Sequence, residues 1–328
     1  MKPLLSIIVP AYNSHETYKR CLNSIYMQDF KNYEVIIVDD GSKDSFAKEL
    51  DDYCRKKNNF KVIHTKNNGV SSARNLGIKM SIGKYLMFLD SDDYILNGML
   101  KTFVDAIHSN SVDIVIGGYM LLNDFNFSCG CQFNNEYYNK DKFWNFISLN
   151  TKKFGYICSK IYKLNIIKNN HILFNENMYS QEDLDFNLSY YYCCQTYLFI
   201  DSIDYIYDFT PSNRKPDFIT YIKNQIKLYF YANEQSHIDI NSFNSIYNRI
   251  ENLIYCYLYD SCTYQELKKR CDRINCISGI YNFFEDCINL NNKVGILKFF
   301  YNKQFLIIYL YIKTRKLLGR LKKLINDN

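Results

Sequence analysis

Short apolar runs alternate with amphipathic stretches along the first third of the chain. The runs are rich in β-branched and large apolar residues, which favours strands, whereas the stretches between them have the apolar spacing of helices. The expected strands are Leu4–Val9, Glu34–Asp39, Phe60–His64, Tyr85–Leu89 and Val112–Gly117. The expected helices are Glu16–Met27, Ser45–Lys57, Ser71–Ser81 and Asn97–Ser109. Strands joined by crossover helices predict an α/β fold with a mainly parallel sheet flanked by helices.

The pattern is less regular from residue 118 to residue 215. The expected elements there are a strand at Tyr119–Phe125, helices at Lys140–Leu149, Lys160–Lys168 and Glu182–Cys194, and a strand at Tyr197–Phe209. Pro211 and Pro216 flank a polar stretch, which is typical of a domain boundary. Helical spacing without strands follows it. We therefore expect a catalytic domain over residues 1–215 and a C-terminal helical appendage over residues 216–328.

Helix-capping signals stand at the starts of three helical stretches. Asn13 or Ser14 is expected to cap the first helix, and the pair Ser71 and Ser72 the third. Thr263, with a glutamate three residues later, has the pattern of a capping box in the helical appendage.

Three carboxylates directly follow the expected strand Tyr85–Leu89, in the sequence Asp90-Ser91-Asp92-Asp93. Acids this close repel one another, and a bound divalent cation relieves that repulsion because it prefers oxygen ligands. Open α/β sheets also bind ligands at the carboxyl ends of their strands. The alternative is a solvated acidic turn, and the segment alone does not decide between the two.

Two further loops are expected at the same edge of the sheet. Pro10–Asn13 follows the first strand, and Asp39–Ser42 follows the second. With the acid cluster they offer an aromatic face, isolated carboxylates and a cation site, which suits a nucleoside diphosphate. The sequence lacks G-x-G-x-x-G after the first strand and lacks G-x-x-x-x-G-K-[ST] altogether. These absences argue against a dinucleotide dehydrogenase and a P-loop NTPase.

Four motifs in this order resemble the family 2 glycosyltransferases of GT-A fold. They are Ser6–Asn13, Val38–Ser42, Asn68–Gly77 and Phe88–Asp93. The resemblance runs to about residue 210 and does not cover the helical tail. It implies a Rossmann-like GT-A fold, a nucleotide-sugar donor that is usually a uridine diphosphate (UDP) sugar, and inverting transfer of a hexosyl or N-acetylhexosaminyl group.

The resemblance assigns roles to the residues of the first two loops. Those implied to border the nucleoside are Pro10, Ala11, Tyr12 and Asn13. Asp39 takes the position of the acid that accepts the uracil imide proton. Two simpler interpretations stay open: Tyr12 packs at the domain edge, and Asp40 and Ser42 serve only the turn and the following helix.

The third and fourth motifs carry the diphosphate and metal roles. Arg74 and Asn75 fall where the family approaches the diphosphate and ribose. Asp90 and Asp92 match the D-x-D element that holds the ribose and a divalent metal, Mg²⁺ or Mn²⁺, and Asp93 supports that loop. A plain ion pair between Arg74 and a surface acid is the alternative for that residue.

An inverting transfer needs a general base for the proton of the acceptor hydroxyl. The resemblance implies Asp183 as this base, with Glu182 beside it, at the start of a helix. The alternative is a helix cap formed by Ser180 and Asp183. Because a helix N-terminus lowers the pKa of a carboxylate, we expect the base to be ionised and weak at neutral pH. Gln181 replaces the glycine common in the family, which predicts a stiffer loop.

Composition bears on the compartment. The 328-residue chain is 47% hydrophobic and 23% charged, as in globular proteins. Its twelve cysteines are scattered and histidine is scarce, so zinc spacing is missing. The first apolar run is too short for a signal peptide. These features predict reduced thiols in a cytoplasmic protein.

The C-terminal tail is strongly cationic, with nine basic residues and one acid from residue 293 onward. The apolar run Phe305–Ile312 is shorter than the about 20 residues that span a bilayer. Farther on, one helical face carries Leu317, Leu318, Leu321 and Leu324. This predicts an interfacial helix attracted to anionic lipid. The alternative is a helix packed on its own protein or on a twin subunit, as in a homo-oligomer. Nucleic-acid binding is not expected, because no aromatic and basic motif accompanies the charge.

The sequence thus predicts a metal-dependent glycosyltransferase, peripheral on the inner face of the cell membrane. It would transfer a sugar to a glycan or lipid-linked glycan acceptor of a surface polysaccharide such as capsule or lipopolysaccharide. A catalytically inactive binding or scaffold subunit is one alternative. A sugar-phosphate nucleotidyltransferase is another, but it needs a glycine-rich basic loop after the first strand, and Pro10–Asn13 is not one.

Overall fold

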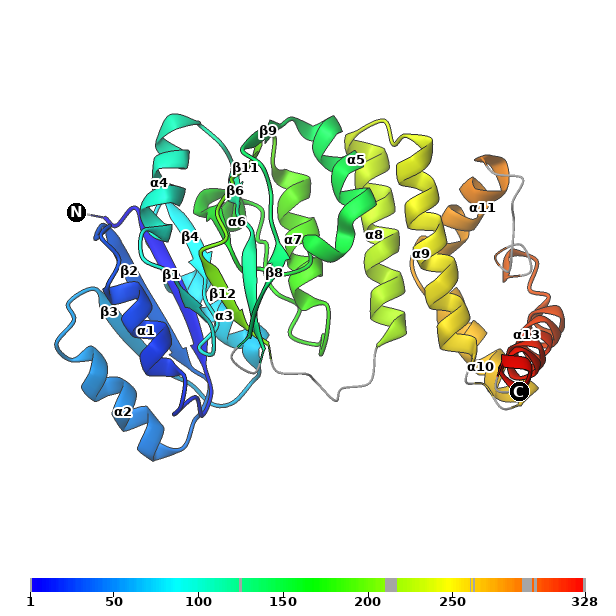
Figure 1. The fold of residues 1–328 in the computed structure, drawn as a ribbon, viewed down its shortest axis with the longest axis horizontal. Helices are drawn as coiled ribbons and strands as arrows, with labels where there is room; N and C mark the ends of the chain where they lie inside the picture. Colours follow the sequence, from blue (N-terminus) through cyan, green and yellow to red (C-terminus); the bar gives the residue numbers. More distant parts are fainter. Residues whose placement is uncertain are drawn as a thin grey trace. The chain divides into compact units, whose positions relative to one another are not determined.

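The computed structural model divides the chain into two compact units, Met1–Arg214 and Lys215–Asn328 (Figure 1). It describes residues 2–123, 126–209, 217–259, 261, 263–290, 297 and 300–326, and of residues 152, 290 and 317–326 only the backbone. The division lies one residue from the boundary expected at residue 215. The polar stretch that suggested this boundary, residues 212–215, is outside the described residues.

An eight-stranded mixed sheet forms the centre of the first unit, in the order β3-β2-β1-β4-β10-β6-β11-β9. Its strands are β1 (Leu5–Ala11), β2 (Tyr33–Asp39), β3 (Phe60–His64), β4 (Tyr85–Phe88), β6 (Ile114–Ile116), β9 (Glu136–Tyr138), β10 (Lys160–Lys163) and β11 (Tyr197–Phe199). The first four strands in this order are parallel, and Ala11, Asp39 and His64 lie in register at their carboxyl ends. The loops after these strands therefore gather at one edge.

A second sheet of four strands has the order β5-β12-β7-β8. Its strands are β5 (Tyr94–Ile95), β7 (Tyr119–Asn123), β8 (Asn126–Cys131) and β12 (Tyr205–Asp208). Because β5 follows the acid cluster directly and pairs with β12, this sheet brings residues near 205–208 back to the site loops.

Helices flank the large sheet, as Figure 1 shows. In the first unit they are α1 (Tyr18–Tyr26), α2 (Asp44–Cys54), α3 (Val70–Met80), α4 (Met99–Ser109), α5 (Lys140–Asn150), α6 (Leu164–Asn169) and α7 (Glu182–Cys193), with a short 3-10 turn at Thr151–Lys153. Helix α3 packs on β1 and β2. Gly77 permits this approach, because a Cβ atom there would lie 2.4 Å from the Cγ2 atom of Ile8. The glycine of the third motif is thus explained by helix–sheet packing.

Two secondary-structure predictions were wrong. The segment expected as one helix, Lys160–Lys168, begins with β10, which pairs antiparallel with β4 and β6 before α6 starts. The strand expected at Tyr197–Phe209 is two strands, β11 and β12, in different sheets. Short apolar segments are ambiguous in period, and here pairing with central strands decided the outcome. The end of the strand expected at Tyr119–Phe125 lies outside the described residues.

The capping predictions were only partly right. Helix α1 begins after Thr17, so neither Asn13 nor Ser14 caps it. Gly69 precedes α3, with φ of 91°, so the pair Ser71 and Ser72 lies inside that helix. At helix α10, the Thr263 hydroxyl does accept a hydrogen bond from the Glu266 amide.

The second unit is helical over its described residues. Its helices are α8 (Phe218–Gln235), α9 (Ile240–Tyr259), α10 (Tyr264–Asn275), α11 (Ile280–Leu290) and α13 (Phe305–Asn326). Helix α13 contacts α9 and α10, and it buries Phe305, Ile308 and Ile312. Among the described residues, no helix is both long and apolar enough to cross a bilayer.

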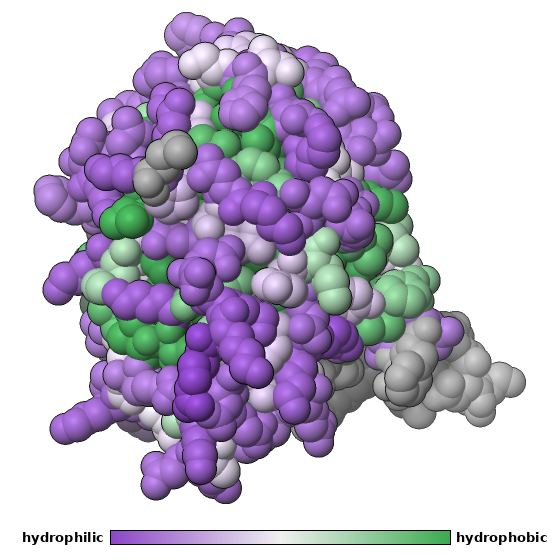
Figure 2. Space-filling view, turned by 90° about the vertical axis from the view of Figure 1, so that its left-hand side faces the viewer, coloured by the Kyte–Doolittle hydropathy of each residue, from purple (hydrophilic) through white to green (hydrophobic). Residues whose placement is uncertain are grey.

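Apolar side chains are concentrated inside both units. The core includes fully buried residues of strands β1, β2 and β4 and the aromatic residues of α5 and α7. The face drawn in Figure 2 is mostly hydrophilic, with smaller apolar patches between the polar side chains.

Candidate functional site

Polar contacts join the loops at the carboxyl edge of the sheet. The backbone amide of Asn13 donates a hydrogen bond of 2.9 Å to the Ser42 hydroxyl oxygen, and the Asn13 side chain accepts one of 3.1 Å from the Lys43 amide. Ser14 and Ser91 are linked through their hydroxyl groups at 2.9 Å. Asn13 has a φ of 50°, which fits its place in a tight turn. The loops after β1, β2 and β4 thus form one connected surface.

The two acids at the end of β2 are both buried, and both carboxylates accept hydrogen bonds. Asp39 accepts a hydrogen bond from the Ser42 amide at 3.2 Å, and its second oxygen lies 2.7 Å from Nδ1 of His64. Asp40 accepts from the amides of Asn68 and Gly69, just ahead of α3. This contact is the structural role that the sequence left open for Asp40. In this structure His64 contacts one carboxylate oxygen of Asp39, the residue that the resemblance assigns to uracil.

Tyr12 projects from this edge, with 53% of its surface exposed, whereas Ala11 is buried at the end of β1. An exposed aromatic ring at the end of a central strand is available to stack on a planar group.

Arg74 joins the acid cluster to the acids at the start of α7. It is 3% exposed, and one terminal nitrogen lies 2.8 Å from Oδ1 of Asp90. The other lies 2.9 Å from Oδ1 of Asp183 and 3.8 Å from Glu182. The guanidinium also packs 5.3 Å from the ring centroid of Phe174. A planar group with several donors holds carboxylates from two directions, which a lysine cannot reproduce.

Asp183 is not the weak base that its position on the helix suggested. Burial raises the pKa of Asp183 to about 7, against the lowering effect of Arg74. Its side chain keeps 23% of its surface exposed, so the carboxylate is still accessible. The expected lowering by the helix N-terminus is therefore wrong, because desolvation outweighs it. A pKa near neutrality suits a group that accepts a proton.

The helix-cap alternative for Asp183 was also wrong. Gln181 occupies the N-cap position of α7 with a φ of 63°, and no side-chain cap bond forms. The Ser180 hydroxyl is buried without a hydrogen-bond partner, and the Asp183 carboxylate turns to Arg74 instead.

The carboxylates of the acid loop after β4 lie in different environments. Asp93 is 1% exposed and accepts hydrogen bonds from the Tyr205 hydroxyl at 2.6 Å and the Asp208 amide at 2.9 Å. Burial and the charges of Asp90 and Asp92 raise its pKa well above the usual range. Asp92 is exposed; partial desolvation and repulsion from Asp90 raise its pKa to about 6.

A model of glycosyl transferase family 2 matches residues 6–161. The uncharacterized glycosyltransferase EpsJ of Bacillus subtilis (strain 168) is 32% identical over 217 residues, which are 65% of this chain and 63% of EpsJ. Residues 6–161 belong to glycosyl transferase family 2. Glycosyltransferase GlyG of Streptococcus pneumoniae is 35% identical over 120 residues, or 36% of this chain and 40% of GlyG. Each alignment therefore spans less than two thirds of the relative's own length.

Solved structures show that the family 2 region has the GT-A fold. A crystal structure of Staphylococcus aureus TarS 1–349 in complex with UDP-GlcNAc superposes with a TM-score of 0.70 at 20% identity. The match covers 97% of this chain and 92% of that chain. Its complex with UDP gives a TM-score of 0.72.

Two residues, Arg20 and Asp208, join the site without a sequence signal of their own. Arg20 of α1 donates a hydrogen bond to the backbone carbonyl of Asp92 and pairs with the carboxylate of Asp208 at the end of β12. Its guanidinium stacks 4.7 Å from the ring centroid of Tyr94. The contact between Arg20 and Asp208 spans 188 residues of sequence, so only the fold reveals it.

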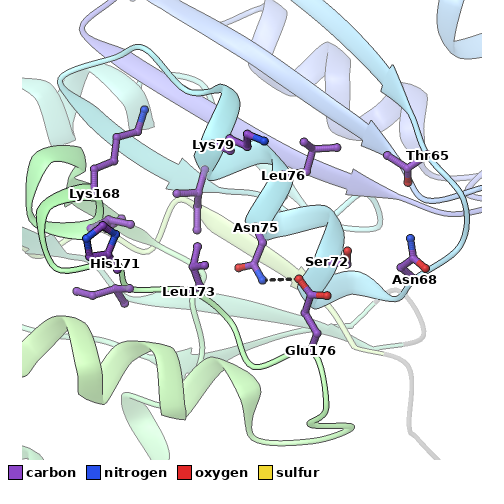
Figure 3. Close-up of a pocket in the computed structure, with 13 residues that line it drawn as sticks. Thr65, Asn68, Ser72, Asn75, Leu76, Lys79, Lys168, His171, Leu173 and Glu176 are labelled. Carbon is purple, nitrogen blue, oxygen red and sulfur yellow. Dashed lines mark hydrogen bonds between the residues drawn. The ribbon is translucent and has the colours of Figure 1, made fainter.

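Asn75 points away from the acids, although it follows Arg74 in the chain. Its side chain bonds to both backbone groups of Phe174 and to the Glu176 carboxylate at 2.9 Å. Figure 3 shows this contact beside a cavity of about 640 Å³ on the outer face of α3. The cavity is lined by Leu76, His171 and Glu176 among others, but by no acid of the loop after β4 or of α7. Neighbouring positions on α3 thus serve opposite faces of the helix.

The carboxylates fit a divalent cation only in part. Within the described residues, no group of three or more histidine, cysteine, aspartate or glutamate side chains is arranged to hold a metal. Asp92 and Asp90 offer carboxylate oxygens, which Mg²⁺ and Mn²⁺ prefer. Mg²⁺ commonly binds one or two carboxylates and takes its remaining ligands from water and substrate phosphates. The donor set therefore fits a cation that binds together with a diphosphate.

Proposed function

We propose that this chain is an inverting glycosyltransferase that moves a hexosyl or N-acetylhexosaminyl group from a nucleotide sugar to an acceptor hydroxyl. One observation carries the proposal: Arg74 contacts both Asp90 of the acid loop and Asp183 of α7. A single buried side chain thus spans the acids suited to a leaving diphosphate and a carboxylate suited to a base. Binding of UDP-GlcNAc by TarS supports a UDP sugar as the donor.

The proposed reaction begins when Asp183 accepts the proton of the acceptor hydroxyl. The oxygen then forms a bond to the anomeric carbon of the donor sugar, and the bond from that carbon to the diphosphate oxygen breaks on the opposite face. The pKa of Asp183, about 7, leaves a substantial ionised fraction at neutral pH and makes the carboxylate basic enough to take the proton. Arg74 orients the carboxylate, and Glu182 adds negative charge beside it.

Nucleotide binding is proposed for the loops after β1 and β2 and for the start of α3. Pro10, Ala11, Tyr12 and Asn13 would border the nucleoside. Asp39 would accept the uracil imide proton once His64 moves aside or shares the Asp39 carboxylate. Arg74 would contact the diphosphate only by loosening its hold on Asp90, and Asn75 would support the loop at Phe174 instead of the ribose.

Asp92 and Asp90 are the residues that would hold Mg²⁺ or Mn²⁺. The cation, when bound, would supply positive charge that stabilises the departing nucleoside diphosphate. Protonation of Asp92, whose pKa is about 6, competes with cation binding, so binding should weaken in mild acid.

We also propose that the enzyme acts at the inner face of the cell membrane on a surface glycan or lipid-linked glycan. Four apolar side chains of α13 are exposed in two pairs one helical turn apart: Leu306, Ile307, Leu310 and Tyr311. Lys313 and Arg315 follow on the same helix. Such a surface suits the interface of an anionic membrane, or the equivalent helix of a second subunit. The leucines expected to extend it, from Leu317 onward, have side chains outside the described residues.

Transfer can be tested by incubating the purified chain with Mn²⁺, a panel of nucleotide sugars and simple methyl glycosides. The expected result is release of the nucleoside diphosphate from one donor, faster with acceptor than without it. Asp183→Asn should abolish this release while nucleotide binding persists. Nucleotide binding without any release from the wild-type chain would support an inactive binding subunit instead.

A further inference from the structure

Three partly exposed aromatic rings form a cluster on two segments that contact the proposed site. Tyr156 is 41% exposed and Phe209 is 40% exposed, with Tyr207 half-buried between them. The ring centroids of Tyr156 and Tyr207 are 5.8 Å apart, and those of Tyr207 and Phe209 are 6.3 Å apart. The ring centroid of buried Tyr119 lies 5.6 Å from that of Tyr156 and 6.3 Å from that of Tyr207. We refer to Tyr156, Tyr207 and Phe209 as the aromatic platform.

The backbone of Tyr156 is fixed to the helix that carries Asp183. Asn187 lies one turn beyond Asp183 on α7 and is fully buried. Its amide group donates to the carbonyls of Phe154, Gly155 and Tyr156, at 3.1, 3.2 and 3.0 Å. The buried amine of Lys160 also donates to the carbonyl of Tyr156. These bonds fix the backbone of Tyr156 to α7, the helix whose first turn carries Asp183.

The other two rings are fixed to the acid loop. Tyr207 and Phe209 flank Asp208, whose amide donates to the carboxylate of Asp93. The Phe209 amide donates to the carbonyl of Leu122 in the neighbouring strand at 2.8 Å. Burial, and after it the charges of Asp93 and Asp90, raise the pKa of Tyr207, which agrees with a place close to these acids. The segments that carry the platform are thus joined by hydrogen bonds both to α7 and to the acid loop.

We propose that the aromatic platform binds the acceptor by packing against the apolar face of one of its pyranose rings. This inference rests on the proposed function. Sugar rings present C–H faces that pack on aromatic side chains, and such contact removes apolar surface from water. The base must reach the acceptor hydroxyl, and Tyr156 is anchored to the helix of that base. The donor diphosphate, in contrast, is expected at Asp90 and Asp92. An acceptor ring on the platform would therefore present a hydroxyl to Asp183.

The first test is steady-state transfer from the active donor to methyl α- and β-pyranosides. Tyr156→Ala should raise the KM for the methyl glycoside about tenfold, because one stacking contact is lost. The KM for the donor and the slow hydrolysis of the donor without acceptor should stay unchanged. Tyr156→Phe should keep the wild-type KM, since the ring and not the hydroxyl makes the contact. The matched control is Tyr137→Ala, which removes a 52% exposed tyrosine on β9 and should change nothing.

The second test needs no catalysis. Saturation-transfer NMR should show contact of the pyranose ring protons with the wild-type chain, loss of that contact in Tyr156→Ala and its return in Tyr156→Phe. A raised donor KM with an unchanged acceptor KM would overturn the proposal and place the donor sugar on the platform. Unchanged constants and an unchanged NMR signal in Tyr156→Ala would show that the rings serve packing alone. If the wild-type chain fails to transfer but still gives the NMR contact, the proposed function fails while the platform stands.

Discussion

The acid loop after β4 and the first turn of α7 each place adjacent carboxylates beside Arg74, yet their acids are held in opposite ways. Asp93 in the loop is buried and receives two hydrogen bonds from β12, so it is part of the framework. Asp183 in the helix has one strong partner, the guanidinium of Arg74, and keeps part of its surface exposed. Both have raised pKa values because both lose hydration.

This difference shows that a raised pKa alone does not assign a catalytic role. Burial against fixed donors makes a carboxylate structural, whereas burial with one open side leaves it able to exchange a proton with a ligand. Substitution of the individual carboxylates separates these two situations.

Removing the charge of Asp183 should have the largest effect. We expect Asp183→Asn to lower kcat by about 10²- to 10⁴-fold, because general base catalysis has that size. Nucleotide affinity, measured by calorimetry, should stay near the wild-type value. The control is Asp185→Asn, which removes a charge from the same helical turn. Near-normal turnover in Asp183→Asn would refute its role as the base.

Removing the charge of Asp92 should act on the metal instead. We expect Asp92→Asn to lower turnover by about 10²-fold, the usual size for losing one group that stabilises the transition state electrostatically. A titration with MnCl₂ should show a weaker metal dependence. Glu176→Gln, at the outer face of α3, serves as the control. An identical Mn²⁺ titration curve for Asp92→Asn and the wild type would exclude Asp92 as a ligand.

The sequence predicted the parallel half of the sheet well, because its strands are continuous apolar runs between clear helical stretches. Three of the family 2 motifs end in loops that the structure gathers at one edge of the sheet. Lys160 was assigned to a helix because Lys160–Lys163 is too short to show a period, and its place between β4 and β6 depends on distant pairing partners.

The contacts between the proposed site residues could not be predicted from the sequence. The sequence indicated Arg74, Asp90 and Asp183 separately, but their shared contact joins segments 16 and 109 residues apart. Asp208 and Arg20 are 188 residues apart and lie in no recognised motif. The pKa of Asp183 was misjudged because a sequence shows the helix N-terminus but does not show how much water the fold removes.

The pH dependence of transfer tests whether Asp183 titrates as the environment indicates. The base must be ionised, so kcat/KM should fall as the pH drops below about 7, the pKa of Asp183. Arg74 lowers this pKa, so Arg74→Gln should move the fall to higher pH. Arg74→Lys, which keeps the positive charge, should move it less. The assignment would be contradicted if, at saturating metal, kcat/KM fell at the same pH for the wild type and both variants.

The smallest effect is expected on stability, and it concerns Asp93. Its pKa in the folded protein is raised above the unfolded value, so its protonated form favours folding at low pH and that contribution is lost as the pH rises through the folded pKa. Asp93→Asn removes this titration. As the pH rises from 5 to 8, the free energy of unfolding in urea should therefore decrease more for the wild type than for Asp93→Asn. Asp92→Asn should show less of this change, because Asp92 is exposed and its pKa is raised only to about 6. Equal pH dependence in Asp93→Asn and wild type would mean that the hydrogen bonds from Tyr205 and the Asp208 amide keep Asp93 ionised over this range, and that burial does not raise its pKa.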